Sequence, residues 1–385
     1  MPADGEFVRR LSDRSLTTWN QTRKPLSKWG IAMFSEPHPP PRFLFVDVNR
    51  RCNMRCQHCL YWKAAATDKS SYISIARRNR ILDEFAGLNR QGAVVICGGE
   101  TMLDLDEYFA VTTKCRETGL RCLSVINGTG VTHAEMADRM MREGPSEITV
   151  SLNSHLAEVH DRTRGVRGSF DRAVGALRLL LAAREKRGHG PRIFGMAVIC
   201  EQNYRELDAF YSFVLRDIGA DKLKLNFLQP TFGPPTWWYR DRFFERNIIR
   251  DEEELAAIIR TCDRKYGLRI NPAWLDQVRM YHRCVRDNGG MRWGWRRGKG
   301  TAEHICNSYE RNIMVDLYGR ARLCFNSAFP VTRLSGPGDL KRFWEDSGRL
   351  RQRMSRCNRY CGISHSVRKE SATLPAPAPD QRVRS

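Results

Sequence analysis

Residues 43–59 read FLFVDVNRRCNMRCQHC, a short apolar run followed almost at once by three cysteines. A run such as 43–48, bounded by polar residues, is typical of a strand buried in a parallel sheet. Cys52, Cys56 and Cys59 then form a Cys-x3-Cys-x2-Cys arrangement on the loop after it. The sequence therefore predicts three thiols at the carboxyl end of a strand.

Outward from this stretch, short apolar runs alternate with amphipathic segments, which indicates repeated strand-helix units around a parallel sheet. Six strands are predicted, at 43–48, 93–97, 122–126, 147–152, 192–199 and 222–228. Helices are predicted between them, among others at 73–88, 133–142, 170–186 and 204–215. Six units are too few for a closed eight-fold barrel. The fold class is therefore α/β, a partial (β/α)6 TIM-type barrel, with ligands expected at the carboxyl ends of its strands.

Four regions are predicted along the chain. Residues 1–40, which run into the prolines 39–41, form a lead-in, and 41–271 form the partial barrel. After Pro272 the alternation is expected to stop, and 272–368 read as a smaller cysteine-rich domain. Residues 369–385, with their Ala-Pro repeat, read as a disordered tail.

The 385 residues include 41% apolar residues, enough for a sizeable core, and thirteen cysteines. An odd number of cysteines, several of them clustered, favours metal ligation over disulfides. The amino-terminal arginines Arg9, Arg10 and Arg14 are not followed by an apolar segment, and no run is long enough to span a bilayer. We predict a soluble, reduced, cytoplasmic protein with no membrane partner.

A net charge of +21 raises the question of nucleic acid. The charge is spread along the whole chain and is mostly arginine, which a solvated surface explains more simply, so no nucleic-acid partner is expected. The densest basic segment, residues 279–299, could receive an acidic or phosphorylated substrate, or could be solvated charge.

The first cysteine set suits an iron-sulfur cluster. A 4Fe-4S cluster needs four ligands, so three cysteines leave one iron open to a non-protein ligand. Zinc is the alternative, since Cys-x2-Cys pairs near a histidine such as His58 also bind it. Zinc would need a fourth ligand close by, and none follows until Cys97.

This spacing resembles the radical S-adenosylmethionine (SAM) superfamily. Gly98, Gly99 and Glu100 follow the second strand and are similar to the Gly-Gly-Glu motif of that family, which binds the amino group of SAM. Glycines there are expected to let the backbone approach the ligand, and the carboxylate to accept hydrogen bonds from the ammonium.

Further cofactor contacts follow from the resemblance. Asn127 resembles a family position, and Ser151 and Asn153 would bond the ribose, although ordinary turn chemistry explains them equally well. Arg164 would contact the SAM carboxylate, with a surface salt bridge as its alternative. His58 and Tyr61 would pack by the adenine.

The resemblance implies that a reduced cluster cleaves SAM, and that the resulting 5'-deoxyadenosyl radical abstracts a hydrogen atom from a substrate. It also implies an electron donor of the flavodoxin or ferredoxin type.

A second cysteine set lies near the carboxyl terminus: Cys306, Cys324, Cys357 and Cys361. Residues 313–323 read as a hairpin turning at Tyr318 and Gly319. Four thiolates can complete an auxiliary 4Fe-4S cluster, and the pattern resembles the SPASM and twitch domains of this family. The final Cys-x3-Cys departs from the expected Cys-x2-Cys, and structural zinc is the alternative. A complete cluster would transfer electrons or support structure, favouring net oxidation or epimerisation of the substrate.

The six other cysteines are mostly expected to be buried small apolar residues. Cys200, which ends the fifth strand, and Cys284, on the basic segment, are candidates to return a hydrogen atom to a substrate radical.

The predicted function is a radical enzyme acting on a natural product, sugar or peptide. The first 40 residues lack the pattern of a small peptide-binding domain, which slightly favours a small molecule. Trp237, Trp238 and Tyr239 would line the pocket or pack between domains. The alternatives are an RNA-modifying radical enzyme and a zinc-binding nucleic-acid or regulatory protein.

Overall fold

The computed structural model describes residues 38–59, 61–62, 71–229, 242–287, 304–325, 330–355 and 366–368, with the backbone alone for 287, 304–306 and 366–368. The chain divides into two compact units, Met1–His38 and Pro39–Ser385. The predicted lead-in therefore lies almost entirely outside the described residues, and the elements below all belong to the second unit.

The core is a sheet whose six central strands are the predicted ones. They are β1 (Phe43–Asn49), β2 (Ala93–Gly98), β3 (Arg121–Ile126), β4 (Glu147–Ser151), β5 (Arg192–Ile199) and β6 (Lys222–Phe227). Each pairs in parallel with the next, in sequence order. The bounds agree with the expected ones to within about one residue, because each run is bounded by turn or polar residues.

The sheet extends further than the sequence indicated. It continues from β1 to β8 (Asn312–Val315), β9 (Arg320–Arg322) and β10 (Thr332–Arg333), in the order β10-β9-β8-β1-β2-β3-β4-β5-β6. β8 runs parallel to β1, whereas β9 and β10 add antiparallel strands, and the expected hairpin with Tyr318 and Gly319 in its turn joins β8 to β9. The predicted hairpin therefore belongs to the same sheet as the barrel strands, which the sequence did not indicate. The sheet is not closed, and the fold is an open, partial barrel.

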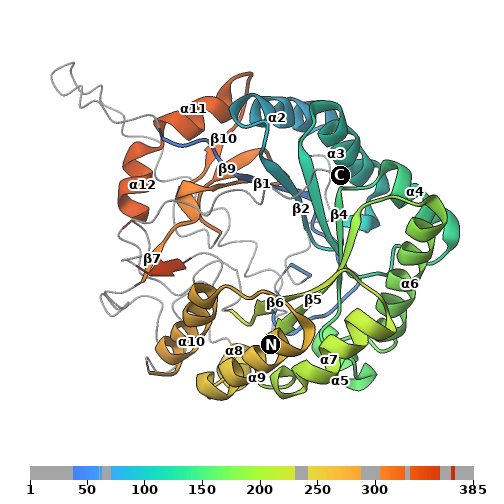
Figure 1. Ribbon diagram of the computed structural model, residues 1–385. Helices are drawn as coiled ribbons and strands as arrows, with labels where there is room; N and C mark the ends of the chain where they lie inside the picture. Colours follow the sequence, from blue (N-terminus) through green and yellow to red (C-terminus); the bar gives the residue numbers. More distant parts are fainter. Residues whose placement is uncertain are drawn as a thin grey trace, which may run out of the picture. The chain divides into compact units, whose positions relative to one another are not determined.

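Helices flank the strands, and in Figure 1 they form a ring around the curved sheet. They are α2 (Ile75–Leu88), α3 (Leu105–Thr118), α4 (Ala134–Glu143), α5 (Ala157–Arg164), α6 (Ser169–Arg187), α7 (Leu207–Ser212), α8 (Arg242–Asn247), α9 (Glu252–Tyr266), α10 (Pro272–Asp287), α11 (Asp339–Asp346) and α12 (Gly348–Met354).

Capping residues set two of the helix starts. The Ser74 side chain accepts from the N–H of Arg77, so α2 begins two residues later than the apolar pattern predicted. The His133 ring likewise accepts from the N–H of Met136 at the start of α4. The segment predicted as one helix over 204–215 is instead a 3-10 turn, the short helix α7 and a π turn.

Strand alternation forms the core. β1 buries Leu44, Val46 and Val48, which share one apolar cluster with Leu82 and Phe85 of α2. Such residues lose nearly all contact with water, which is the main stabilising contribution to the fold.

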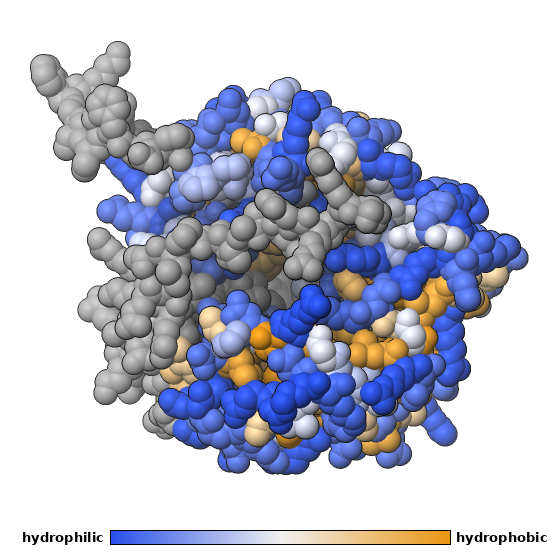
Figure 2. Space-filling view, in the orientation of Figure 1, coloured by the Kyte–Doolittle hydropathy of each residue, from blue (hydrophilic) through white to orange (hydrophobic). Residues whose placement is uncertain are grey.

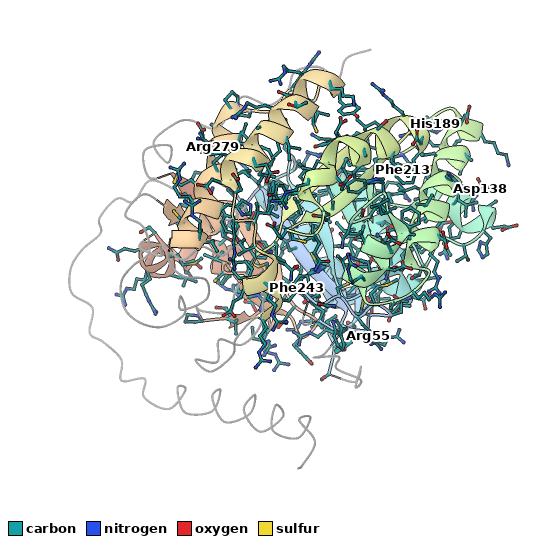
Figure 3. All side chains as sticks on the ribbon, turned by 90° about the horizontal axis from the view of Figure 1, so that it is seen from below. Arg55, Asp138, His189, Phe213, Phe243 and Arg279 are labelled. Atoms are coloured by element: carbon teal, nitrogen blue, oxygen red, sulfur yellow. The ribbon has the colours of Figure 1, made fainter. Side chains whose placement is uncertain are left out.

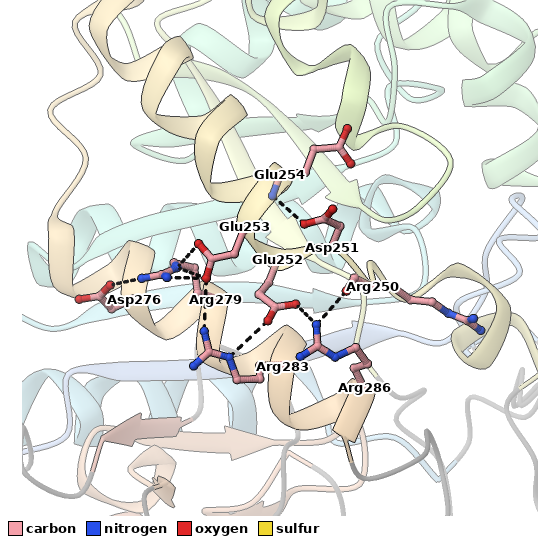
Figure 4. Close-up of polar contacts among 9 residues, drawn as sticks. All are labelled: Arg250, Asp251, Glu252, Glu253, Glu254, Asp276, Arg279, Arg283 and Arg286. Atoms are coloured by element: carbon pink, nitrogen blue, oxygen red, sulfur yellow. Dashed lines mark hydrogen bonds and ion pairs between the residues drawn. The ribbon is translucent and has the colours of Figure 1, made fainter.

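Ion pairs connect helices α9 and α10 (Figure 4). Arg283 and Arg286 of α10 contact Glu252 at 3.3 and 2.6 Å, and Arg279 and Arg283 contact Glu253. These three arginines lie in the basic segment 279–299, for which the sequence left open the binding of an anionic substrate. Because carboxylates of α9 already pair with these arginines, their charge is better explained by helix packing than by substrate binding.

The face drawn in Figure 2 is mostly hydrophilic, in keeping with the charged composition. No helix in the described part of the chain is both long and apolar enough to cross a bilayer.

Glu252 is 4% exposed, so removing its charge would leave two arginines beside an uncharged group. We expect Glu252→Gln to lower the free energy of unfolding by about 2 kcal/mol, as measured by urea denaturation. Glu253→Gln is the control, because that side chain is 52% exposed and exposed ion pairs contribute little. Equal losses in both variants would contradict the importance of burial.

Candidate active site

The cysteine loop, residues 50–59, leaves the carboxyl end of β1. Its own backbone shapes it: the N–H of Cys59 donates to the Cys56 carbonyl at 3.2 Å, and the N–H of Met54 donates to Cys52 Sγ at 3.4 Å. Trp62 Nε1 donates to the same Cys56 carbonyl at 3.0 Å. Cys56 is buried, and Cys52 and Cys59 are half-buried. One short irregular segment therefore carries all three thiols.

The thiols lie near enough to influence one another. Burial raises the pKa of Cys52, and it raises that of Cys59 to about 11, with further increases from the neighbouring thiols. Among the described residues, no three Cys, His, Asp or Glu side chains converge into a finished metal cage. The donor set nonetheless fits a cluster, because a bound metal centre would deprotonate the three thiols and stabilise the thiolates on one loop.

Gly98 and Gly99 pack directly against the backbone of this loop. The N–H of Gly99 donates to the Asn49 carbonyl at 2.9 Å, and that of Glu100 donates to the Arg51 carbonyl at 2.8 Å. A Cβ on Gly98 or Gly99 would lie 2.2 or 2.1 Å from those two carbonyl oxygens. From the sequence, these glycines were expected to approach a ligand. In the structure, the close approach of the cysteine loop requires them.

A third glycine holds the loop from its other side. The N–H of Arg55 donates to the carbonyl of Arg164, the last residue of α5, at 3.0 Å. Gly165 follows with φ +67°, and a Cβ there would lie 2.4 Å from the Arg55 carbonyl oxygen. The loop is thus fixed between the end of β2 and the end of α5.

Glu100 connects the loop to the next two elements. Its Oε1 accepts from the N–H of Met102 at 3.2 Å and its Oε2 from that of Asn127 at 2.7 Å. Its own carbonyl accepts from Asn49 Nδ2 at 2.9 Å. The side chain is 3% exposed, and this burial raises the pKa of Glu100 to about 7. The carboxyl group is therefore poised to change protonation near neutral pH.

A chain of amides joins the loop to the end of β3. Asn127 Nδ2 donates to Asn53 Oδ1 at 2.7 Å, and Asn53 Nδ2 donates to Thr129 Oγ1 at 2.8 Å. The Thr129 hydroxyl donates to Asn127 Oδ1 at 2.7 Å, which closes the network. Sequence reasoning missed Asn53, although it lies inside the cysteine motif, because asparagine in a loop is usual.

Residues 46–214 match the sequence family described as the Radical SAM superfamily. This stretch holds the cysteine loop, the Gly-Gly-Glu turn and α5. Residues 46–214 are a radical SAM domain.

Named relatives agree with this assignment. Fe-coproporphyrin III synthase of Methanosarcina barkeri is 31% identical over 186 residues, covering 48% of this chain and 43% of the relative. Mycofactocin maturase MftC of Mycobacterium tuberculosis is 30% identical over 209 residues, covering 54% and 50%. The chain thus spans about half the length of the curated relatives it matches.

The fold also matches solved structures. Native anSMEcpe with bound AdoMet and peptide aligns with a TM-score of 0.53 at 15% identity, covering 83% of each chain. At that identity the likeness concerns the fold, an open partial barrel.

Of the expected ribose ligands of the radical SAM domain, Asn153 is engaged by protein. It accepts from the N–H of Val198 at 3.1 Å and donates to Thr163 Oγ1 at 3.0 Å, while Asn203 Nδ2 donates to its carbonyl at 2.7 Å. These bonds fix the corner between β4 and α5. Ser151 is buried at the end of β4 and forms no side-chain hydrogen bond with another described residue.

Arg164, His58 and Tyr61 surround the loop. Arg164 forms no ion pair within the described ranges, and its charge lowers the pKa of Glu100 and opposes protonation of His58. Burial, with this charge, lowers the pKa of His58 to about 4, and its ring lies 6.1 Å from that of Phe243. Tyr61 lies by Asp47, whose negative charge, more than burial, raises the tyrosine pKa.

The two candidate hydrogen donors share one environment. Cys200, directly after β5, and Cys284 of α10 belong to a single buried apolar cluster with Leu228, Phe244 and Met280. Burial raises the pKa of Cys200 to about 11, so its sulfur is a thiol at neutral pH. Cys115, Cys122 and Cys262 are buried as well, and Cys97 is half-buried.

The second cysteine set is described in part. The Ser308 hydroxyl donates to the Leu323 carbonyl at 2.8 Å, joining the segment after Cys306 to the one before Cys324. The backbone of Cys306, in β7 (His304–Cys306), pairs with Ser366 of β11 (Ser366–Arg368). Predicted residues that lie outside the described part of the chain are Cys357, Cys361, Trp237, Trp238 and Tyr239.

Gly99→Ala should prevent the loop from seating, because the new Cβ would displace the Arg51 carbonyl. We expect a loss of stability of about 3 kcal/mol and little iron bound after anaerobic reconstitution, as measured by iron and sulfide per chain. Gly87→Ala, on α2, is the control, because a Cβ there meets nothing within 4 Å. Normal iron uptake by Gly99→Ala would refute the packing role.

Burial of Glu100 has a pH signature in the metal-free protein. Its folded pKa of about 7 exceeds the unfolded value of 4.5, so the native state holds the proton more tightly and loses stability as pH rises through this window. Between pH 5 and pH 8, the unfolding free energy of wild type should fall by about 2–3 kcal/mol relative to Glu100→Gln. Parallel urea-denaturation profiles for the two proteins would disprove this.

Proposed function

We propose that the chain is a radical SAM enzyme that binds a 4Fe-4S cluster through Cys52, Cys56 and Cys59 and cleaves SAM to oxidise or epimerise a natural-product, sugar or peptide substrate. The observation that carries the proposal is the seating of a three-cysteine loop against the Gly-Gly-Glu turn. Within a radical SAM domain, this arrangement supports one cluster with an iron left open for SAM.

When bound, the reduced cluster supplies the electron that cleaves SAM and releases a 5'-deoxyadenosyl radical able to abstract a substrate hydrogen atom. The residues of the protein bind SAM and orient it. Each carboxylate oxygen of Glu100 accepts one backbone N–H, which leaves acceptor capacity for the SAM ammonium. Arg164, unpaired within the described ranges, supplies a positive charge for the SAM carboxylate.

His58 and Tyr61 would flank the adenine. The lowered pKa of His58 keeps its imidazole neutral near pH 7, and a neutral ring packs against a base without introducing a buried charge. Asn127 and Ser151 complete the proposed cofactor contacts. For Asn153, its bonds to Val198 and Thr163 favour a positioning role in shaping the ribose pocket.

An auxiliary 4Fe-4S cluster on Cys306, Cys324, Cys357 and Cys361 is part of the proposal. The Ser308 to Leu323 bond supports it by bringing the chain near the first two cysteines together. The pairing of β7 with β11 supports it too, because Ser366 lies five residues after Cys361 and pairs with Cys306. Such a cluster could take an electron from a substrate radical, which would give net oxidation.

Cys200 and Cys284 are the proposed hydrogen-atom donors for an epimerisation. A protonated thiol, which burial favours at Cys200, is the form that can return a hydrogen atom. Their shared apolar cluster adjoins the ends of β5 and β6, where a substrate of this fold is expected.

The test is anaerobic reconstitution with iron and sulfide, followed by iron counting, electron paramagnetic resonance and a dithionite assay for 5'-deoxyadenosine. Wild type should hold two clusters and form 5'-deoxyadenosine. Cys52, Cys56 and Cys59 changed together to Ala should leave one cluster and no cleavage. The matched control changes Cys115, Cys122 and Cys262 together to Ala, and should keep both clusters. Bound zinc without SAM cleavage in wild type would overturn the proposal.

A further inference from the structure

Cys97 lies on the inner face of the barrel, at the end of β2. Val94 and Ile96 of the same strand are buried in the apolar core beneath α2 and α3, which Figure 1 shows outside this part of the sheet. Successive side chains of a strand point to opposite faces, so Cys97 points to the inner face, where it is half-buried. Gly98 and Gly99, which seat the cysteine loop, follow it directly. The Cys97 thiol therefore faces the barrel interior beside the Gly-Gly-Glu turn.

Asp47 of β1 lies next to Cys97. The two residues are Cα partners in the parallel pairing of β1 with β2, so their side chains share one face of the sheet. Burial, and then the negative charge of Asp47, raise the pKa of the Cys97 thiol well above its usual range. The sulfur therefore stays protonated near neutral pH, and a protonated thiol has a hydrogen atom to donate.

The Asp47 carboxyl group is available to a ligand. It is 7% exposed, yet it forms no hydrogen bond or ion pair with another residue that the structure describes. Burial raises its pKa to about 6, although the charges of Arg322 and Arg50 oppose this shift. A buried carboxylate without a hydrogen-bond donor costs free energy, so a donor group on a bound molecule would stabilise it. The carboxyl group and the thiol beside it therefore mark a place for a ligand.

This place adjoins both proposed cofactor sites. Tyr61, which would flank the adenine, has its pKa raised first by the charge of Asp47, then by burial and by Cys97. Phe45 shares the inner face of β1 with Asp47, and its ring centroid lies 4.8 Å from that of Phe325, which directly follows a proposed auxiliary-cluster cysteine. A molecule beside the thiol would therefore lie close to SAM and to the auxiliary-cluster segment.

The two other candidate thiols have different surroundings. Cys200 and Cys284 are 2% and 7% exposed and belong to one apolar cluster. Phe243 packs against this cluster, toward the same edge of the molecule as Arg55 of the cysteine loop (Figure 3). Apolar side chains thus enclose both sulfurs, whereas Cys97 lies beside an acidic side chain on the inner face.

We propose that Cys97 is a catalytic residue that donates a hydrogen atom to the substrate radical. The inference rests on the proposed function, and it adds to Cys200 and Cys284 a thiol that faces the reacting groups. The 5'-deoxyadenosyl radical takes a hydrogen atom from a substrate C–H bond, and the substrate radical then takes one from the Cys97 S–H bond. The resulting thiyl radical gains one electron from the reduced auxiliary cluster and one proton from water, which restores the thiol.

The test uses SAM alone, because the radical can react with Cys97 when no substrate is bound. Reconstituted protein cleaves SAM with excess dithionite in heavy water, where the thiol carries deuterium and dithionite reduces the thiyl radical. Mass spectrometry then measures the fraction of 5'-deoxyadenosine that contains one deuterium. Wild type should give mainly the deuterated product. Cys97→Ser should give mainly the unlabelled one, because a hydroxyl O–H bond is too strong to donate its hydrogen atom.

Cys122→Ala is the matched control. Cys122 lies on the neighbouring strand β3, but it is buried in the core on the helix side of the sheet, so this variant should keep the wild-type deuterium fraction. Iron content checks that each variant holds its clusters. If Cys97→Ser lowers it, Cys97→Ala replaces that variant and should show the same loss of deuterium.

The outcomes separate the two proposals. If wild type forms no 5'-deoxyadenosine, the proposed function fails. If wild type forms it and Cys97→Ser keeps the wild-type deuterium fraction, the hydrogen-donor role is refuted while the proposed function stands. Loss of deuterium in Cys200→Ser, with Cys97→Ser unchanged, would assign the donor to the apolar cluster and also refute the inference.

Discussion

The backbone contact between the cysteine loop and the end of β2 is the constraint on which the site depends. Two hydrogen bonds, from Gly99 to Asn49 and from Glu100 to Arg51, continue the pairing of β1 with β2 beyond the register shift between Asp47 and Asn49. Because Gly98 and Gly99 have no side chains, the loop lies at backbone distance from the turn. Backbone contacts thus fix the path of the loop and leave the cysteine side chains available to bind a ligand. The loop is therefore preorganised by the protein itself.

Glu100 extends this constraint into the barrel. Its carboxyl group bonds the backbone of Met102 and of Asn127, and Asn127 bonds Asn53 of the loop. The ends of β1, β2 and β3 are therefore joined through one buried acid. Burial that holds its pKa near 7 also makes the group responsive to a bound ammonium, since a nearby positive charge favours the ionised form.

The six parallel strands could be predicted because each is a local apolar run between turn residues. β8 could not, because a four-residue strand gives almost no periodic signal, and its partner β1 lies about 270 residues earlier in the chain. The same difference holds at the site. The spacing of Cys52, Cys56 and Cys59 is visible in the sequence, whereas the roles of Asn53 and Asn203 depend on partners about 50 to 75 residues away. The charge on Arg279 was visible, and its neutralisation by Glu253 on another helix was not.

The two clamps on the cysteine loop face different surroundings. On one side, the Gly-Gly-Glu turn meets the loop at the carboxyl ends of β2 and β3, where a ligand of this fold is expected. On the other, the end of α5 meets it among exposed arginines. The two clamps are nonetheless close to each other, because the charge of Arg164 at the end of α5 lowers the pKa of Glu100 at the end of β2. A group held by the loop would therefore lie between a carboxyl group from one clamp and a guanidinium group from the other.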